Sequence, residues 1–217
     1  MIKLAVFDLD GTLINSIEDL ADAVNRALYE NGYKTHPTES YYRFVGDGTK
    51  KLIERALPAG TDKAEQERIH SIFSGYYKSG CLNKTRPYDG IIGAVEEIKK
   101  SGIKCAVASN KPDAFSKQIV SSLFPEDLFD LVRGKTDGTK AKPAPDIIFE
   151  ILKSFGVSPG EAVMIGDSDV DVLTAYNAGM KCIGCEWGFR GYDELFRAGA
   201  DVIIKSPGQL DDAVENI

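Results

Sequence analysis

Two aspartates near the start of the chain, Asp8 and Asp10, have a spacing that could support chemistry. They follow the apolar run Leu4–Phe7, which is typical of a strand buried on both faces. Side chains alternate along an extended chain, so both carboxylates can point to the same side, and Gly11 then lets the backbone turn away. The ordinary alternative is a turn that uses these residues for its geometry alone.

A pair of carboxylates at the end of a buried strand requires a compensating cation, because the two charges repel each other and lose hydration. Clustered oxygen ligands suit a hard ion, so the pattern predicts a Mg²⁺ site. In open α/β folds, ligands bind at the carboxyl edge of the sheet. We expect Asp8 and Asp10 to lie at that edge.

Three further segments carry polar residues at the ends of predicted strands or in the loops after them. Ser109 and Asn110 are expected to lead into a helix N-terminus, whose free N–H groups favour a phosphate. Lys142 supplies a positive charge from a stiff loop. Asp167 ends a strand, and Asp171 lies one helical turn later, where it can support the same ion. Alone, these groups could be a helix cap, a solvated lysine and a helix N-terminal charge cluster, but their order favours one shared site.

The elements that must position these residues alternate between strand and helix. Apolar runs at 103–108, 129–132, 162–165, 181–185 and 201–204 predict further strands, with helical segments between them. This alternation predicts an α/β fold, a Rossmann-like parallel sheet with helices on both faces and right-handed crossovers. Because parallel strands share one carboxyl edge, the polar segments should meet there.

A stretch of about 65 residues after the first strand has helical periodicity throughout. Its first helix is predicted to begin with Ser16 as the N-cap. We therefore expect an α/β core domain of residues 1–14 and 85–217, and an all-helical cap domain of residues 15–84. The insert leaves the sheet directly after the first strand, so it should lie beside the aspartate pair.

Composition narrows the possible functions. The chain has 217 residues and a formal net charge of −7, which disfavours nucleic-acid binding because phosphate backbones require a basic surface. No apolar run is long enough to cross a bilayer, and the chain begins directly with a strand, so we expect a cytoplasmic protein. Cys182 and Cys185 have redox-motif spacing but lie within a strand pattern, where packing is the expected role.

Together, four motifs resemble those of the haloacid dehalogenase-like phosphohydrolase superfamily. The resemblance covers essentially the whole chain, including an insert where the family places its helical cap. Segments 43–48, 55–57 and 186–189 are similar to the phosphoglycolate phosphatase branch. The four motifs are Asp8-Leu9-Asp10-Gly11-Thr12-Leu13, Ser109-Asn110, Lys142-Pro143-Ala144-Pro145 and Gly166-Asp167-Ser168-Asp169-Val170-Asp171.

The resemblance implies a role for each core residue. Asp8 would be the nucleophile that forms an aspartyl-phosphate, and Asp10 would be the general acid and then the base. Mg²⁺ would be bound by the Asp8 carboxylate, the Asp10 backbone carbonyl and the Asp167 carboxylate, with Asp171 in support. The groups implied to hold the phosphate oxygens are Ser109, the Asn110 backbone and Lys142.

For the cap, the resemblance implies that the Gly46-Asp47-Gly48 loop, with Arg43 nearby, recognises the leaving group. Arg43 could equally belong to a solvated helix face. Two positions depart from the family pattern. Asn15 stands where the family often has Asp, and Asp47 stands where this branch often has asparagine or another polar residue. An extra carboxylate at residue 47 could disfavour an acidic substrate.

The expected function is a Mg²⁺-dependent phosphatase that hydrolyses a small phosphomonoester through an aspartyl-phosphate, with 2-phosphoglycolate as the expected substrate. The alternatives are a phosphosugar mutase similar to beta-phosphoglucomutase, a phosphatase or pyrophosphatase of different preference, and a phospho-ligand binder without activity. We expect a small phosphorylated metabolite as the partner, no nucleic acid and no membrane, and a monomer or homodimer.

Overall fold

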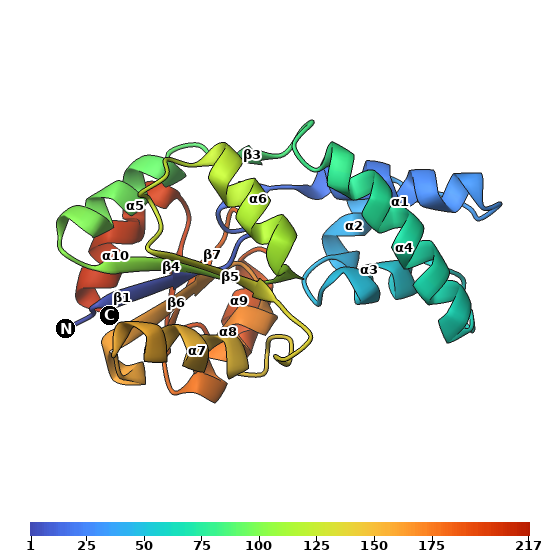
Figure 1. Cartoon of the computed structure of the whole chain (residues 1–217). Coiled ribbons are helices and arrows are strands. Elements are labelled where there is room, and N and C mark those ends of the chain that lie inside the picture. Colours follow the sequence, from blue (N-terminus) through green and yellow to red (C-terminus); the bar gives the residue numbers. More distant parts are fainter.

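The computed structural model describes residues 1–217 and shows an α/β core joined to a group of helices (Figure 1). The strands of the main sheet are β1 (Leu4–Phe7), β4 (Lys104–Pro112), β5 (Leu131–Lys135), β6 (Ala162–Gly166), β7 (Lys181–Cys185) and β8 (Val202–Ile204). The helices of the core are α5 (Ile91–Lys100), α6 (Asp113–Leu123), α7 (Asp146–Phe155), α8 (Asp169–Ala178), α9 (Tyr192–Ala198) and α10 (Leu210–Asn216).

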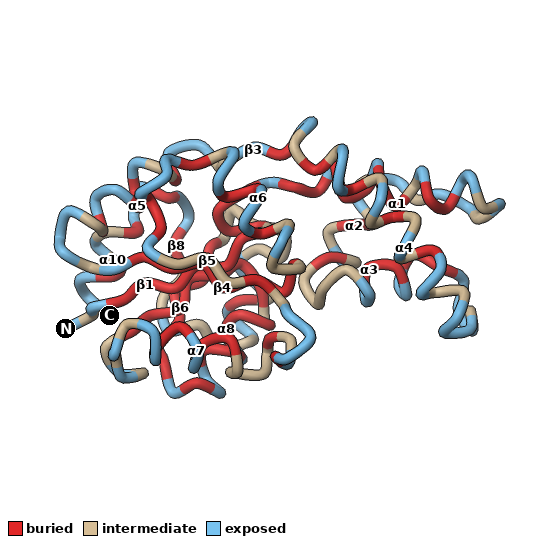
Figure 2. Tube along the Cα trace, in the orientation of Figure 1, coloured by how far each residue is buried: buried red, intermediate tan, exposed pale blue.

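The sheet has the order β5-β4-β1-β6-β7-β8, and its strand pairs are all parallel. Strand β1 pairs with β4 on one side and β6 on the other, so Val6 lies between Ala106 and Met164. Every residue of β1 is fully buried (Figure 2). The predicted parallel α/β sheet is confirmed, and the central position of β1 puts Asp8 in the middle of the carboxyl edge.

Helices cover both faces of the sheet, as predicted (Figure 1). One face carries α5, α6 and α10, whose buried residues join a cluster of 40 that also includes Phe7 and much of the helical insert. The other face carries α7, α8 and α9, with a cluster of 16 buried residues that includes Leu4 and Val6. Alternation along β1 therefore divides its side chains between two hydrophobic layers.

Strand β5 lies later in the chain than the predicted strand at 129–132. Phe129 packs edge-on against Phe7 and Phe124 instead of pairing in the sheet, with ring centroids 6.0 and 5.4 Å apart. Aromatic rings favour such edge-to-face contacts in a core. The first part of the predicted strand therefore lies in the loop before β5, whereas Leu131 and Val132 pair in the sheet as predicted.

The insert contains α1 (Ile17–Glu30), α2 (Thr38–Phe44), α3 (Thr49–Ala56) and α4 (Lys63–Gly80). These four helices lie together at one end of the molecule (Figure 1). Two short strands, β2 (Ile14–Asn15) and β3 (Arg86–Pro87), form an antiparallel pair where the chain enters and leaves the insert. None of the helices in the protein has both the length and the apolar character needed to span a membrane.

A buried carboxylate, Asp19 of α1, joins the start of the insert to the segment by which the chain leaves it. Its oxygens accept hydrogen bonds from the backbone N–H of Lys84 and of Thr85 and from the Thr85 hydroxyl, at 2.7 to 3.0 Å. Asp19→Ala should lower the free energy of unfolding by about 2–4 kcal/mol, because it leaves these buried donors without an acceptor. Urea unfolding would measure the loss, with the exposed Asp22→Ala of the same helix as control. Equal stability of both variants would contradict the assignment.

The two cysteines with redox-motif spacing cannot form a pair. Cys182 packs in the cluster on one face of the sheet and Cys185 in the cluster on the other face. Residues three apart on a strand point to opposite faces. All the cysteines of the chain are free and buried, and burial raises the pKa of both the Cys182 and the Cys185 thiols. The predicted packing role therefore fits this geometry.

Candidate active site

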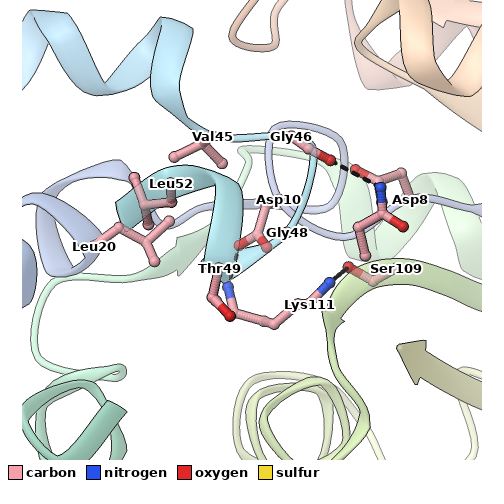
Figure 3. Close-up of a pocket in the computed structure, with 11 residues that line it drawn as sticks. Asp8, Asp10, Leu20, Val45, Gly46, Gly48, Thr49, Leu52, Ser109 and Lys111 are labelled. Atoms are coloured by element: carbon pink, nitrogen blue, oxygen red, sulfur yellow. Dashed lines mark hydrogen bonds and ion pairs between the residues drawn. The ribbon is translucent and has the colours of Figure 1, made fainter. Parts of the chain in front are cut away.

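A small cavity lies between the carboxyl edge of the sheet and the helical insert (Figure 3). The space inside it that is open to a water molecule is about 30 Å³. The core side supplies polar groups, and the insert supplies three apolar side chains together with backbone of the loop before α3. The lining residues are Asp8, Asp10, Ser109, Asn110 and Lys111 from the core, and Leu20, Val45, Gly46, Gly48, Thr49 and Leu52 from the insert.

Asp8, at the end of β1, is held by a buried lysine. Lys142 Nζ lies 2.6 Å from Asp8 Oδ1 and 2.7 Å from Asp171 Oδ1. The side chain of Lys142 is only 2% exposed, so these are strong charge-assisted bonds. Asp171 Oδ2 in turn accepts from the backbone N–H and the hydroxyl of Ser168, at 3.2 and 2.7 Å. The structure thus brings Lys142 and Asp171 to Asp8.

Asp10 has its own set of partners. Lys111 Nζ lies 2.5 Å from Asp10 Oδ1, and the Ser16 hydroxyl donates to the same oxygen. Ser16 is the N-cap residue of α1, as predicted, but its hydroxyl makes no cap bond and donates to Asp10 instead. Both donors act on Oδ1, which leaves Oδ2 of Asp10 free for a bound molecule.

Sequence reasoning missed Lys111, whose side chain is 2% exposed and lines the cavity. A signal for it existed. Lys111 lies two residues after Ser109, and alternation along a strand directs residues at that spacing to the same face. The predicted apolar strand ended at Ala108, and Ser109 and Asn110 were expected to lead into a helix, so the strand spacing was not applied to Lys111.

Strand β4 continues to Pro112, and α6 begins only at Asp113. Ser109 and Asn110 were expected to lead directly into a helix N-terminus, but they lie within β4, which still pairs with β5 at Pro112 and Lys135 after an irregularity. Their contribution is a hydroxyl and backbone at the cavity wall.

The Asn110 side chain joins three segments of the chain. Its Oδ1 accepts from the backbone N–H of Lys142 at 2.7 Å, and its Nδ2 donates to the carbonyls of Lys142 and Gly46, both at 3.0 Å. Gly46 belongs to the insert, so Asn110 connects the loop that carries Lys142 with the loop before α3. Sequence analysis assigned only the backbone of this residue to the site.

Asp167, after β6, completes a group of carboxylates suited to a metal ion. Asp8, Asp167 and Asp171 each offer an oxygen, and these oxygens all lie within 4.8 Å of one another. Asp167 is fixed by the backbone N–H of Phe189 at 2.7 Å and by the Thr12 hydroxyl at 3.3 Å. Three buried hard-oxygen groups with only one balancing lysine fit a divalent ion such as Mg²⁺.

Glycines shape the space around Asp167. A Cβ added at Gly11 would lie 2.3 Å from Asp167 Oδ2, and one added at Gly188 would lie 2.2 Å from Asp167 Cβ. Gly11 also has a φ of +95°, which L side chains rarely adopt. Both positions therefore exclude any larger residue and let the chain close around the carboxylate.

Burial raises the pKa of Asp8 to about 7, with Lys142 opposing the shift and Asp171 adding to it. Burial also raises the pKa of Asp167, with the charges of Asp171 and Asp8 contributing. The pKa of Lys142 is raised as well, since its two carboxylate neighbours outweigh the effect of burial. Without a metal ion these carboxyls therefore resist ionisation, and a bound cation would favour their ionised forms.

Metal binding should therefore change how stability depends on pH. The Asp8 carboxyl has a pKa of about 4 in an unfolded chain and about 7 when folded. Because the folded value is raised, its stabilising contribution is complete below about pH 4 and is lost as the pH rises through about 7. Saturating Mg²⁺ binds the ionised form, so its stabilising effect should grow over this range.

Urea unfolding at about pH 5 and about pH 7.5, with EDTA or with Mg²⁺, would measure this effect. We expect the increase in unfolding free energy caused by Mg²⁺ to be larger at the higher pH. An increase of equal size at both pH values would contradict the assignment of Asp8 as a ligand. Asp169→Asn, which changes a partly exposed acid outside the cluster, should behave as wild type.

The residues expected to recognise the leaving group fall into two sets. Gly46 and Gly48 line the cavity, whereas Arg43 and Asp47 do not. Arg43 is exposed, and Asp47 Oδ2 pairs with Arg55 Nη2 at 2.5 Å. The Asp47 carboxylate is thus neutralised within the insert, so it need not repel an acidic substrate.

The insert is in contact with the core around the cavity. Arg190, in the segment after β7, donates from Nη2 to the carbonyl of Val45 at 2.9 Å. The rings of Phe189 and Tyr42 meet edge-on, with centroids 5.5 Å apart. Because the backbone of Phe189 also binds Asp167, the segment after β7 touches both the carboxylate cluster and the insert.

A sequence model of the haloacid dehalogenase-like hydrolase family matches residues 5–185. This range spans most of the core and the whole insert, and it includes both lysines and all four aspartates of the site. The chain belongs to the haloacid dehalogenase-like hydrolases. The predicted superfamily is confirmed, and so is the predicted class of enzyme, a phosphoric monoester hydrolase.

Relatives with similarity over most of their length carry one name. The chain is 34% identical over 195 residues to the phosphoglycolate phosphatase of Psychrobacter arcticus, covering 86% of this chain and 84% of the relative. It is 32% identical over 214 residues to the phosphoglycolate phosphatase of Aquifex aeolicus, covering 99% and 97%. A crystal structure described as a predicted phosphatase from Clostridium acetobutylicum has a TM-score of 0.91 at 29% identity, with each chain covered completely at 100%.

Proposed function

We propose that the protein is a Mg²⁺-dependent phosphatase that hydrolyses 2-phosphoglycolate or a closely similar small phosphomonoester through an aspartyl-phosphate. The observation that carries this proposal is the cavity wall, where Asp8 and Asp10 lie side by side and each is paired with its own buried lysine. A nucleophile and a proton carrier so close together suit stepwise phosphoryl transfer.

Asp8 attacks the phosphorus, and the bond from phosphorus to the leaving oxygen breaks as the Asp8–phosphorus bond forms. Lys142 orients Asp8 through Oδ1 at 2.6 Å and opposes the rise in the Asp8 pKa that burial causes, which favours the ionised carboxylate. The same ammonium can contact a phosphate oxygen, and the Ser109 hydroxyl at the cavity wall supplies a further donor. These fixed donors stabilise charge on the phosphoryl oxygens.

Asp10 passes a proton to the leaving oxygen, and it later removes one from the water that hydrolyses the aspartyl-phosphate. Its free oxygen, Oδ2, is suited to this task because Oδ1 is held by Ser16 and Lys111. The two donors fix the carboxyl plane while the reactive oxygen faces the cavity. A proton carrier that cannot rotate away keeps its geometry through both steps.

Mg²⁺ would be held by the carboxylates of Asp8 and Asp167 and by the backbone carbonyl of Asp10, with Asp171 supporting from behind through Lys142. When bound, the ion shields Asp8 from the anionic phosphate and aligns the two. Thr12 and the backbone of Phe189 hold Asp167 in place for this purpose.

The insert, with boundaries at residues 15–84, acts as a cap that closes over the substrate and excludes bulk water. The hydrogen bonds from Asn110 to Gly46 and from Arg190 to Val45 support this role, since both join core to insert beside the cavity. Space for only a water or two remains inside, so the cap must open for substrate to enter. The antiparallel pair β2–β3 is suited to be the hinge.

A two-carbon substrate is favoured by the names of the relatives. A phosphosugar mutase would have to enclose a larger substrate. The deciding experiment compares kcat/KM for a panel of phosphomonoesters: 2-phosphoglycolate, hexose phosphates and p-nitrophenyl phosphate, all with Mg²⁺. We expect phosphoglycolate to rank first and inorganic phosphate to be released. Conversion of one hexose phosphate isomer into another would overturn the proposal.

A further inference from the structure

Lys111 has no assigned role in phosphate or metal binding, although it is a buried cation in the wall of the cavity. An ammonium carries three N–H donors. One of them is used by Asp10 Oδ1, and the nearby Tyr77 hydroxyl, which has no other partner, can accept a second. At least one donor is left for a further acceptor. The other neighbour is the ring of Tyr77 from α4, with Nζ 5.1 Å from its centroid.

The two buried lysines of the site differ in how their charge is balanced. Lys142 pairs with two carboxylates, Asp8 and Asp171, and in the proposed mechanism it contacts the phosphoryl group. Lys111 pairs with one carboxylate, Asp10, on the side where the leaving group departs. A second anionic group in the cavity would therefore find its free cationic donors at Lys111.

The side chains of the insert that line the cavity near Lys111 are apolar, so the charge of Lys111 matters most for binding an anion there. Leu20, Val45 and Leu52 of the insert face the cavity, and they offer no hydrogen bond to an anion (Figure 3). In such surroundings a carboxylate is strongly disfavoured without a cation, and a buried ammonium gains from a second acceptor. Distance also fits, since Lys111 lies within one hydrogen bond of Asp10 and the proposed proton transfer requires the leaving oxygen to do the same.

We propose that Lys111 recognises a carboxylate carried by the leaving group one carbon away from the ester oxygen, and so selects phosphorylated hydroxy acids over phosphorylated alcohols. This inference rests on the proposed phosphatase function. The Lys111 ammonium bridges Asp10 and the substrate carboxylate, which places the leaving oxygen beside the free oxygen of Asp10. Lys111 is thus a residue of substrate specificity.

The test compares 2-phosphoglycolate with 2-hydroxyethyl phosphate, which has a similar size but lacks the carboxylate. Lys111→Met removes the charge and keeps the length of the side chain. Because Lys111 also holds Asp10, we expect kcat/KM to fall for both substrates. The loss for 2-phosphoglycolate should be roughly 10- to 100-fold larger than that for 2-hydroxyethyl phosphate, with the difference mostly in KM. Lys111→Arg, which keeps the charge, should retain most of the preference for the acid.

Equal losses on both substrates would overturn the inference, because they would show that Lys111 serves only to hold Asp10. If wild type itself shows no preference for 2-phosphoglycolate, the proposed substrate fails instead, and if it hydrolyses neither compound the phosphatase proposal fails. A crystal structure of Asp8→Asn with 2-phosphoglycolate gives a readout independent of the folding of Lys111 variants. The carboxylate should lie within hydrogen-bond distance of Lys111 Nζ, and its binding at the backbone of Thr49 instead would refute the assignment.

Discussion

Asp8→Asn is expected to abolish turnover, with kcat for p-nitrophenyl phosphate and Mg²⁺ falling by about 10⁴-fold or more. An amide cannot attack phosphorus as a carboxylate does, and it is also a poor ligand for Mg²⁺. The fold should persist, because Lys142 keeps Asp171 as a partner at 2.7 Å. Steady-state kinetics and thermal unfolding of the same preparation would measure both quantities.

Asp169→Asn is the matched control for this variant. Asp169 lies in the first turn of α8, only two residues from Asp167, but it is partly exposed and belongs to no cluster in the site. It should keep near-normal rates. A folded Asp8→Asn protein with rates close to those of wild type would mean that another group attacks phosphorus.

Lys142→Met should damage both stability and activity. It leaves Asp8 and Asp171 buried and facing each other without their shared cation, and breaking a buried ion pair in this way typically costs about 3–5 kcal/mol. Turnover should fall by about 10²-fold or more, since a donor to the phosphoryl oxygens is lost. Urea unfolding and kcat/KM with Mg²⁺ would test the two effects separately.

Mg²⁺ offers a further check on Lys142→Met. Because the carboxylates lose their only cation, the stabilisation caused by Mg²⁺ should be larger in this variant than in wild type. Lys140→Met, an exposed lysine of the same loop, should match wild type in every measurement. Lys142→Met with unchanged stability and unchanged response to Mg²⁺ would show that the buried pairs have no such role.

The meeting of distant segments at one edge could be predicted because it follows from topology. Once the alternation of strand and helix indicated a parallel sheet, Asp8, Lys142 and Asp167 had to approach one another, and the structure brings them into contact or within 4.8 Å. The apolar run of β1 predicted the position of Asp8, because the residue that follows a fully buried strand lies at the carboxyl edge of the sheet.

Partners of single side chains were harder to predict, because they depend on where each strand ends. Because β4 extends to Pro112, Asn110 lies in the strand and its side chain binds the carbonyl of Gly46 in the insert. The same extension directs Lys111 toward Asp10. Ser16 offered a similar choice between capping α1 and bonding Asp10, and local pattern could not weigh the second option. Asp47 was expected at the leaving group, but its pairing with Arg55 required the packing of α2 against α3.

The central claim is that phosphate passes through a covalent bond to Asp8, and chemical trapping tests it most directly. Acid quenching during turnover of 2-phosphoglycolate with Mg²⁺, followed by borohydride reduction, converts a phosphorylated aspartate into homoserine. Peptide mass spectrometry should find homoserine at residue 8, only when both substrate and Mg²⁺ were present. Its appearance at another aspartate, or its absence at residue 8 while a trapped phosphoenzyme is detected elsewhere, would contradict the account.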